Sequence, residues 1–186
     1  MDVSIVDGTG KGKSLLIDEN NYAHVFSVGS PIDQHINMEL GTVYACVVSV
    51  TPAGAGNCFF YLKNDSILPM HLSNLRVRAV GAAEGIQIKL KDTGTPAAGI
   101  AVTPVNKNTS IGSLAECTTE YVTNITGLSG GSIVDLLWVD ASALTFKFEW
   151  ASDLIIAKND IVSFYAVTGS IPLIVTATIY FYNYEH

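Results

Sequence analysis

Short runs rich in β-branched and aromatic residues, separated by Gly, Pro, Asn, Asp or Ser, follow one another along most of this chain. Such runs predict strands, because these side chains pack well on a pleated sheet and the separating residues suit turns. Their number and close spacing favour an all-β fold, an antiparallel β-sandwich, over alternating strands and helices. The expected strands are Tyr22–Val28, Val43–Val50, Cys58–Leu62, Leu75–Val80, Ile86–Leu90, Ile133–Val139, Phe146–Trp150, Ile161–Val167 and Leu173–Tyr182.

The polarity pattern inside the runs predicts how each strand is placed. Ile86–Leu90 and Phe146–Trp150 alternate apolar and polar residues, which is typical of a half-exposed strand. Ile171–Val175 is apolar on both faces, as expected for a strand between the core and either a second layer or another subunit. One short helix is expected from Ser30 to Leu40, where Ser30-Pro31 supplies an N-cap and a first-turn proline. Two loops are expected from their length and composition, Asp92–Thr103 and Thr123–Ser132.

Length and composition predict one principal domain. The 186 residues are enough to bury a sizeable core, and we expect residues 1–29 to hold an extended N-terminal arm and the first strands, with residues 30–186 forming a single β-sandwich domain. Hydrophobic residues make up 48% of the chain and charged residues 15%. This balance indicates either a surface that a partner covers or a well-packed β-protein with a Ser/Thr/Asn surface.

The net charge of −7 argues against two classes of partner, because the summed field repels nucleic acid and anionic membranes. The most apolar stretch, Ile171–Tyr182, is too short for a membrane helix and reads as a buried strand. The three cysteines, Cys46, Cys58 and Cys117, are far apart and odd in number, which favours buried thiols from a reducing cytoplasm over a zinc or redox motif.

Residues Asp7–Ser14 look like a nucleotide-binding loop. Gly12-Lys13-Ser14 supplies the second half of a P-loop, but Asp7 stands where the first glycine belongs. A P-loop also opens a helix, whereas here Leu15-Leu16-Ile17 is followed at once by the turn-forming segment 18–21. The context therefore predicts strand, turn and strand, and we expect no nucleotide site.

The remaining candidates for chemistry also have plainer structural interpretations. The four histidines show no metal-binding spacing, and Asp18–Asn21 lacks the ligand order of a calcium loop. Ile133–Asp140 ends like a magnesium-binding strand, but Asp135 interrupts it. Strand aromatics are mostly core residues, although sugar binding is an alternative for Trp138, Trp150, Tyr180, Tyr182 and Tyr184. We expect no enzyme activity and no cofactor, and assign no catalytic, cofactor-binding or metal residue.

Four segments in the first part of the chain carry a resemblance to a known group of proteins. They are Asp7–Ser14, Ile17–Val25, Leu40–Tyr44 and Phe60–Asp65, and Lys158-Asn159-Asp160 with the two apolar strands after it adds a looser match. The chain resembles small accessory proteins of tailed-bacteriophage particles. The shared pattern is a Gly-rich turn, then a segment like Val-Asp-x-x-Asn-Arg-Leu-x-Val, and then a strand like Leu-Tyr-Leu-Lys-Asn. The chain departs from these proteins at Asn21-Tyr22, where an Arg-Leu pair is common.

The resemblance implies a structural virion protein with a jelly-roll-like β-sandwich, of the capsid decoration or head-fibre base type. It implies a homotrimer, assembled in the host cytoplasm, that binds the major capsid protein or other virion proteins. A neck, tail or head-fibre position and a carbohydrate- or receptor-binding β-module are the alternatives. The Gly-rich residues 1–14 suit an arm that orders on a neighbouring subunit.

Overall fold

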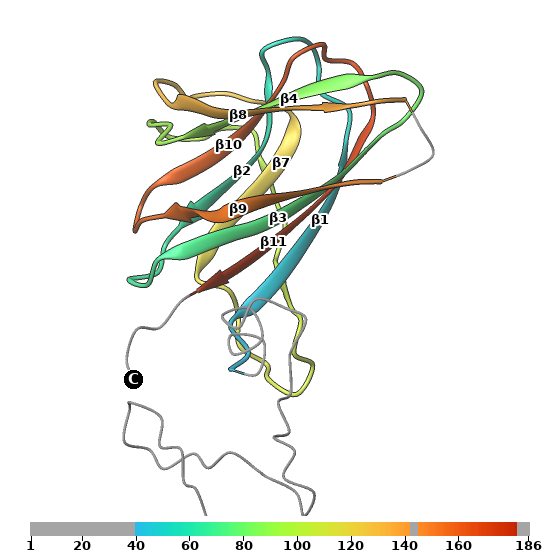
Figure 1. Cartoon of the computed structure of the whole chain (residues 1–186). Helices are drawn as coiled ribbons and strands as arrows, with labels where there is room; N and C mark the ends of the chain where they lie inside the picture. The colour runs from blue at the N-terminus through green and yellow to red at the C-terminus, as the bar shows by residue number, and fades with distance from the viewer. Residues whose placement is uncertain (1–39, 142–144, 182–186) are drawn as a thin grey trace, which may run out of the picture. The chain divides into compact units, whose positions relative to one another are not determined.

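A computed structural model of the chain describes residues 40–141 and 145–181, with the side chains of residues 150–153 left undescribed (Figure 1). These residues belong to one compact unit, Ile36–His186. All regular structure among them is β-strand, and every strand pair is antiparallel. The expected helix from Ser30 and the expected strand Tyr22–Val28 lie outside the described residues, as does the boundary between residues 29 and 30.

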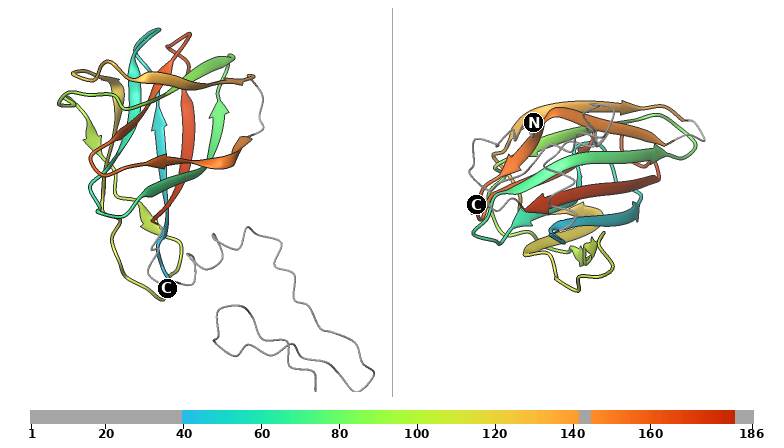
Figure 2. Two further views of the ribbon diagram at one scale, coloured as in Figure 1. Left: turned by 60° about the vertical axis from the view of Figure 1, so that its left-hand side comes forward. Right: turned by 60° about the horizontal axis from the view of Figure 1, so that its bottom comes forward.

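Two sheets pack against each other as two layers (Figures 1 and 2). The five-stranded sheet has the order β6 (Val105–Asn106), β1 (Val43–Val50), β11 (Leu173–Phe181), β3 (Met70–Ala79) and β9 (Phe146–Ile156). The six-stranded sheet has the order β5 (Ile100–Ala101), β7 (Cys117–Ile125), β2 (Cys58–Asn64), β10 (Ile161–Ala166), β4 (Glu84–Leu90) and β8 (Ser132–Val139). The predicted antiparallel β-sandwich is confirmed.

The long strands pair in a nested order. The first strand pairs with the last, β1 with β11, and then β2 with β10, β3 with β9 and β4 with β8. From β1 to β11, the strands of the described residues that fall outside this nesting are β5, β6 and β7, which all lie in residues 91–131 between β4 and β8. The sandwich is therefore a long folded hairpin with one large excursion at its turn.

The core lies between the sheets and follows from alternation along each strand. Leu75, Val77 and Ala79 of β3 are fully buried, whereas Arg76 between them is exposed. Phe60 and Phe164, on the neighbouring strands β2 and β10, stack with ring centroids 5.1 Å apart. Burying aromatic rings of this size is a major source of stability in a β-core.

A second, smaller apolar cluster lies on the outer face of the six-stranded sheet. Its buried members are Cys58, Tyr61, Ile125, Ile161 and Tyr165, and Val122 and Leu128 pack against them. This cluster shows that the excursion also shelters part of the outer face.

Each of the eight strands expected within the described residues has an observed counterpart, although several boundaries differ by a few residues. The strand β7 was not predicted, and the expected loop Thr123–Ser132 was wrong at both ends, since Thr123 to Ile125 belong to β7 and Ser132 begins β8. The expected loop Asp92–Thr103 holds the two-residue strand β5 and is otherwise irregular. The polar β7 forms a strand because it pairs with β2.

Candidate interaction surfaces

The excursion formed by residues 91–131 covers one edge of the sandwich in both layers. β6 pairs with β1 in the five-stranded sheet, and β7 pairs with β2 in the six-stranded sheet, with β5 beyond it. We call this side the covered edge. The outermost strands here, β5 and β6, are only two residues long, and short edge strands offer few unpaired backbone groups.

Asp92 ties the two ends of the excursion together. Its side chain is buried, and Oδ1 accepts a hydrogen bond of 2.7 Å from the backbone N–H of Gly131. Oδ2 accepts hydrogen bonds from the hydroxyls of Tyr165, at 2.7 Å, and Ser163. Burial, and then the hydrogen bond to Asp92, raise the pKa of Tyr165. A buried carboxylate with these donors is satisfied, so Asp92 acts as a structural clasp.

Next to the clasp, the first and the last segment of the excursion run close together. Isolated bridges join Thr93 to Ser129 and Ala97 to Thr126. Gly94 and Gly127 lie between these bridges with φ of 110° and 83°, a region that favours glycine. A Cβ atom on Gly94 would lie 1.9 Å from the carbonyl oxygen of Gly127, so this close approach excludes a side chain.

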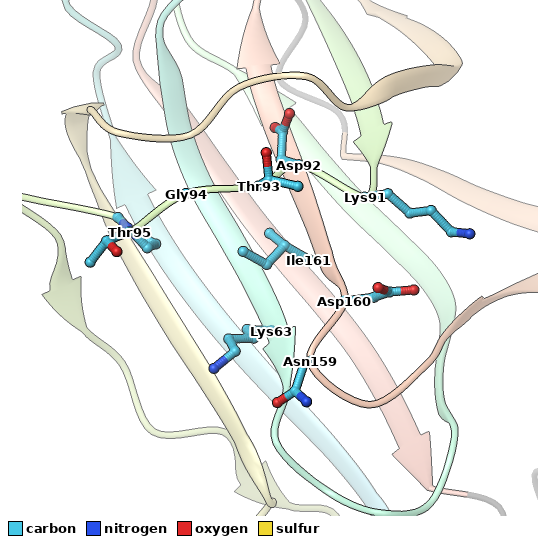
Figure 3. Close-up of a pocket in the computed structure, with 10 residues that line it drawn as sticks. Lys63, Lys91, Asp92, Thr93, Gly94, Thr95, Asn159, Asp160 and Ile161 are labelled. Carbon is cyan, nitrogen blue, oxygen red and sulfur yellow. The ribbon is translucent and has the colours of Figure 1, made fainter.

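A hollow of about 550 Å³ lies beside the clasp (Figure 3). Two of its lining residues, Lys91 and Asn159, have φ of 61° and 67°, which is uncommon outside glycine. Figure 3 shows the ammonium groups of Lys63 and Lys91 pointing apart, and Lys63 forms an ion pair of 3.0 Å with Asp65. A catalytic centre needs groups that converge on one reacting atom, and these groups diverge. The hollow therefore has charged and polar side chains in its lining but no arrangement of a catalytic centre.

The opposite side of the six-stranded sheet ends in a long strand with no neighbour among the described residues. This is β8, which pairs only with β4 there, and we call it the open edge. Leu137 and Val139 of β8 point into the core, while four large apolar side chains are exposed. Their exposed fractions are 57% for Ile133, 44% for Val134, 47% for Leu136 and 56% for Trp138. A register shift opposite Ile88 and Lys89 interrupts the alternation, so Ile133 and Val134 are both exposed.

The start of β4 supports this edge from behind. Gly85 is opposite Trp138, and a Cβ atom there would lie 2.9 Å from Val167 and 3.3 Å from the Trp138 ring. Glu84 is fully buried and accepts hydrogen bonds from the backbone N–H groups of Gly85, Thr168 and Gly169, at 3.0, 2.7 and 2.8 Å. Glu84 therefore fixes the turn between β10 and β11 against β4, and like Asp92 it is structural.

The structure separates the candidates that the sequence singled out. Asp7–Ser14 and Asp18–Asn21 lie outside the described residues. The segment resembling a magnesium-binding strand is β8, and Asp140 follows it as an exposed residue. Trp138 is exposed although a core position was expected for strand aromatics, because it lies on the outer face of an edge strand. Tyr180 is buried, with its ring stacked 4.7 Å from that of His71.

Burial of the thiols, which the sequence predicted, is confirmed for two of the three. Cys46 and Cys58 are buried, Cys117 is half-buried, and none forms a disulfide. Burial raises the pKa of each of these thiols to about 12, which keeps them protonated and unreactive at neutral pH. Among residues 40–141 and 145–181, no group of three or more His, Cys, Asp or Glu side chains is arranged to hold a metal ion.

In the same part of the chain, no helix has the length and apolar character needed to cross a membrane.

The sequence did not predict the covered edge or the open edge. Asp92 and Glu84 gave no signal in the sequence, because their burial depends on hydrogen-bond partners 71 to 85 residues away. The exposure of β8 was equally hidden, since an edge strand and a central strand have similar composition. Together the fold and the surfaces define a two-layer antiparallel β-sandwich that is covered on one side and, on the other, ends in the open edge β8 of one sheet and the 11-residue strand β9 of the other. Comparisons with protein-family models, curated proteins and solved structures find no match.

Proposed function

We propose that this chain is a structural protein of a tailed-phage virion, a capsid decoration or cement protein that binds the head as a homo-oligomer. The resemblance of its first part motivates the proposal. The nested strand order supports it, because pairing first with last and second with second-last is the order expected of a jelly roll, a fold common among viral capsid domains. The jelly-roll assignment is part of the proposal.

The open edge is the observation that carries the proposal. β8 presents unpaired backbone groups together with Ile133, Val134, Leu136 and Trp138. An apolar edge strand of this length is a template for pairing with another chain, and proteins that act as monomers usually blunt such edges. We therefore assign the open edge to contact between copies of this chain.

The proposal is tested with shells of the major capsid protein from the same genome. Full-length protein is mixed with purified shells, sedimented and titrated to saturation. We expect saturable binding of an oligomer at a fixed number of copies per shell. A protein that is monomeric and stays in the supernatant would contradict the proposal.

A neck, tail or head-fibre component is the first alternative, and sedimentation with purified necks, tails or fibres in place of shells distinguishes it. A carbohydrate- or receptor-binding module is the second, favoured by the exposed ring of Trp138 and by the polar hollow near Lys91. Exposed aromatic rings with neighbouring polar groups suit sugar recognition. A glycan array hit that Trp138→Ala abolishes, combined with absence of shell binding, would favour this alternative.

A further inference from the structure

The outer face of the five-stranded sheet gathers positive charge on a chain that is acidic overall. Four of the chain's ten Lys and Arg residues lie on or beside this face, and we call them the basic face: Arg76, Arg78, Lys107 and Lys147. Arg76 and Arg78 point outward because Leu75, Val77 and Ala79 point into the core. Among the outward side chains that the structure describes on this sheet, Glu149 is the one acid.

Two of these cations are placed directly opposite each other. Arg76 of β3 is in register with Lys147 of β9, on the same face of the sheet. Like charges in a directly opposed cross-strand pair destabilise a sheet. Lys147 forms an ion pair with Glu149, two residues along its own strand, and no ion pair of Arg76 is found among the described residues. The fold therefore keeps an unfavourable pair that a bound anion would relieve.

A third cation, Lys107, adds to the positive field from the opposite edge of the same sheet. The backbone N–H of Lys107 donates to the carbonyl of Val43, which places it just beyond β6. Partial removal from water, and then the positive charges of Arg76 and Lys147, lower the pKa of Lys107. Lys107 therefore lies within the field of Arg76 and Lys147, although it is far from both along the chain.

Apolar side chains lie beside these charges. Ile174 is directly opposite Arg78, and Val47 is opposite Thr176, whose other neighbour is Arg76. Val47 is 61% exposed and Ile174 is 39% exposed. The Nε atom of Arg78 is buried and has no hydrogen-bond partner among the described residues. Exposed apolar groups bordered by charges are typical of surfaces that bind another protein.

We propose that the basic face, with Val47 and Ile174, docks onto an acidic surface of a partner protein. That the partner is the capsid shell rests on the function proposed above. Charge complementarity favours an acidic partner, and the exposed apolar side chains of Val47 and Ile174 beside the cations favour a protein over nucleic acid, because a phosphate backbone offers no apolar counterpart. The open edge remains available for contact between copies, because β8 belongs to the other sheet.

The probe for this proposal is poly-L-glutamate, immobilised and presented to the full-length protein at low ionic strength. Arg76→Glu removes the central cation and places an acid opposite Lys147, so it is expected to stabilise the fold while weakening binding about tenfold. A merely structural role for Arg76 would instead couple weaker binding to lower stability. Lys158→Glu is the matched control, with the same charge change at an exposed position in the turn before β10.

Binding of the parent protein and of Lys158→Glu to poly-L-glutamate, with loss in Arg76→Glu, supports the proposal. Equal binding by both variants overturns it, and so does tighter binding to polyuridylate than to poly-L-glutamate. The shell assay separates this proposal from the proposed function. If Arg76→Glu still binds shells, the docking role of the basic face is rejected and the proposed function is not. Binding to poly-L-glutamate without binding to shells rejects the capsid assignment and leaves the basic face supported.

Discussion

The covered edge and the open edge of this sandwich differ in how far their unpaired backbone groups are protected. At the covered edge, residues 91–131 add strands to both sheets and leave only two-residue strands outermost. At the open edge, β8 ends the six-stranded sheet with eight residues and four exposed apolar side chains. An exposed strand edge is a template for pairing with other chains. The contrast between the two edges is the reason for proposing β8 as an assembly surface.

The chemistry of the two edges differs as much as their length. The strand added at the covered edge, β7, is largely polar, and Thr118 of β7 donates a hydrogen bond of 2.6 Å to Asp65. The excursion is closed by the buried carboxylate of Asp92 and by the paired glycines Gly94 and Gly127. The open edge has one charged residue, Asp135, in its whole length. Polar contacts within the chain close one edge, and apolar area remains on the other.

The largest expected effect on stability comes from removing the clasp. Asp92→Ala leaves the Gly131 amide and the hydroxyls of Ser163 and Tyr165 without their acceptor. Hydrogen bonds to a charged group contribute about 1.5–3 kcal/mol each, so for three of them we expect a loss of at least about 4.5 kcal/mol in the free energy of unfolding. Urea unfolding measures this loss, and the Tm should fall by at least roughly 9–18 °C.

The control for the clasp is Asp140→Ala, which removes an exposed carboxylate after β8 and should change stability by less than about 0.5 kcal/mol. Similar losses in the free energy of unfolding for Asp92→Ala and Asp140→Ala would mean that the Asp92 clasp does not stabilise the excursion.

Alkaline pH should have the second-largest effect on the free energy of unfolding. The three thiols lie on β7 of the covered edge and on β1 and β2, the strands that the excursion pairs with. Burial raises the pKa of Cys46 and Cys58 to about 12 from 9.0. Above pH 9 the unfolded chain loses these protons and the native chain keeps them, so stability is full below pH 9 and falls between pH 9 and 12. We expect a loss of about 3 kcal/mol from pH 7 to pH 10 for these two thiols together.

Urea unfolding at pH 7, 8, 9 and 10 tests the thiol account. The double variant Cys46→Ala/Cys58→Ala should reduce the alkaline slope to the part that Cys117 contributes, whatever the stability of the variant at pH 7. An unchanged slope in that variant would assign the pH dependence to other groups.

Crowding at the paired glycines gives the third effect. Gly127 and Gly130 have nearly equal φ, 83° and 84°, so alanine is strained at both positions. A Cβ atom on Gly127 would lie 2.2 Å from the carbonyl oxygen of Thr95, whereas at Gly130 the nearest atom is 3.7 Å away. We expect Gly127→Ala to cost about 2 kcal/mol and Gly130→Ala about 1 kcal/mol. Equal costs would show that the strands of the excursion can separate without penalty.

The contrast between the edges also explains what the sequence could and could not predict. Strands such as Val43–Val50 were predictable because their side chains alternate between core and outer face, a local pattern. The strand β7 was missed because its residues, CTTEYVTNI, carry only a weak apolar alternation and depend on pairing with β2. Asp92 looked like a loop residue, since nothing nearby indicates that Ser163 and Tyr165 will reach it. Edges are set by tertiary pairing, which local patterns do not encode.

The smallest expected effect on stability belongs to the open edge and accompanies the largest expected effect on assembly. Val134→Lys/Leu136→Lys places charges on exposed positions of β8, so the free energy of unfolding should change by less than about 0.5 kcal/mol per substitution. Two lysines on a pairing edge strongly disfavour contact with a second chain. Val47→Lys changes a residue that is more exposed than Val134 and Leu136 but lies on the five-stranded sheet, so it should leave assembly unchanged.

The mass of the protein in solution, measured by light scattering, tests the central claim most directly. We predict a homo-oligomer for the full-length chain, three copies if the resemblance holds, and the mass of a single chain for Val134→Lys/Leu136→Lys. The Val47→Lys variant should keep the parent mass. A monomeric parent protein, or an oligomer that survives both lysines on β8, would contradict the assignment of the open edge to assembly.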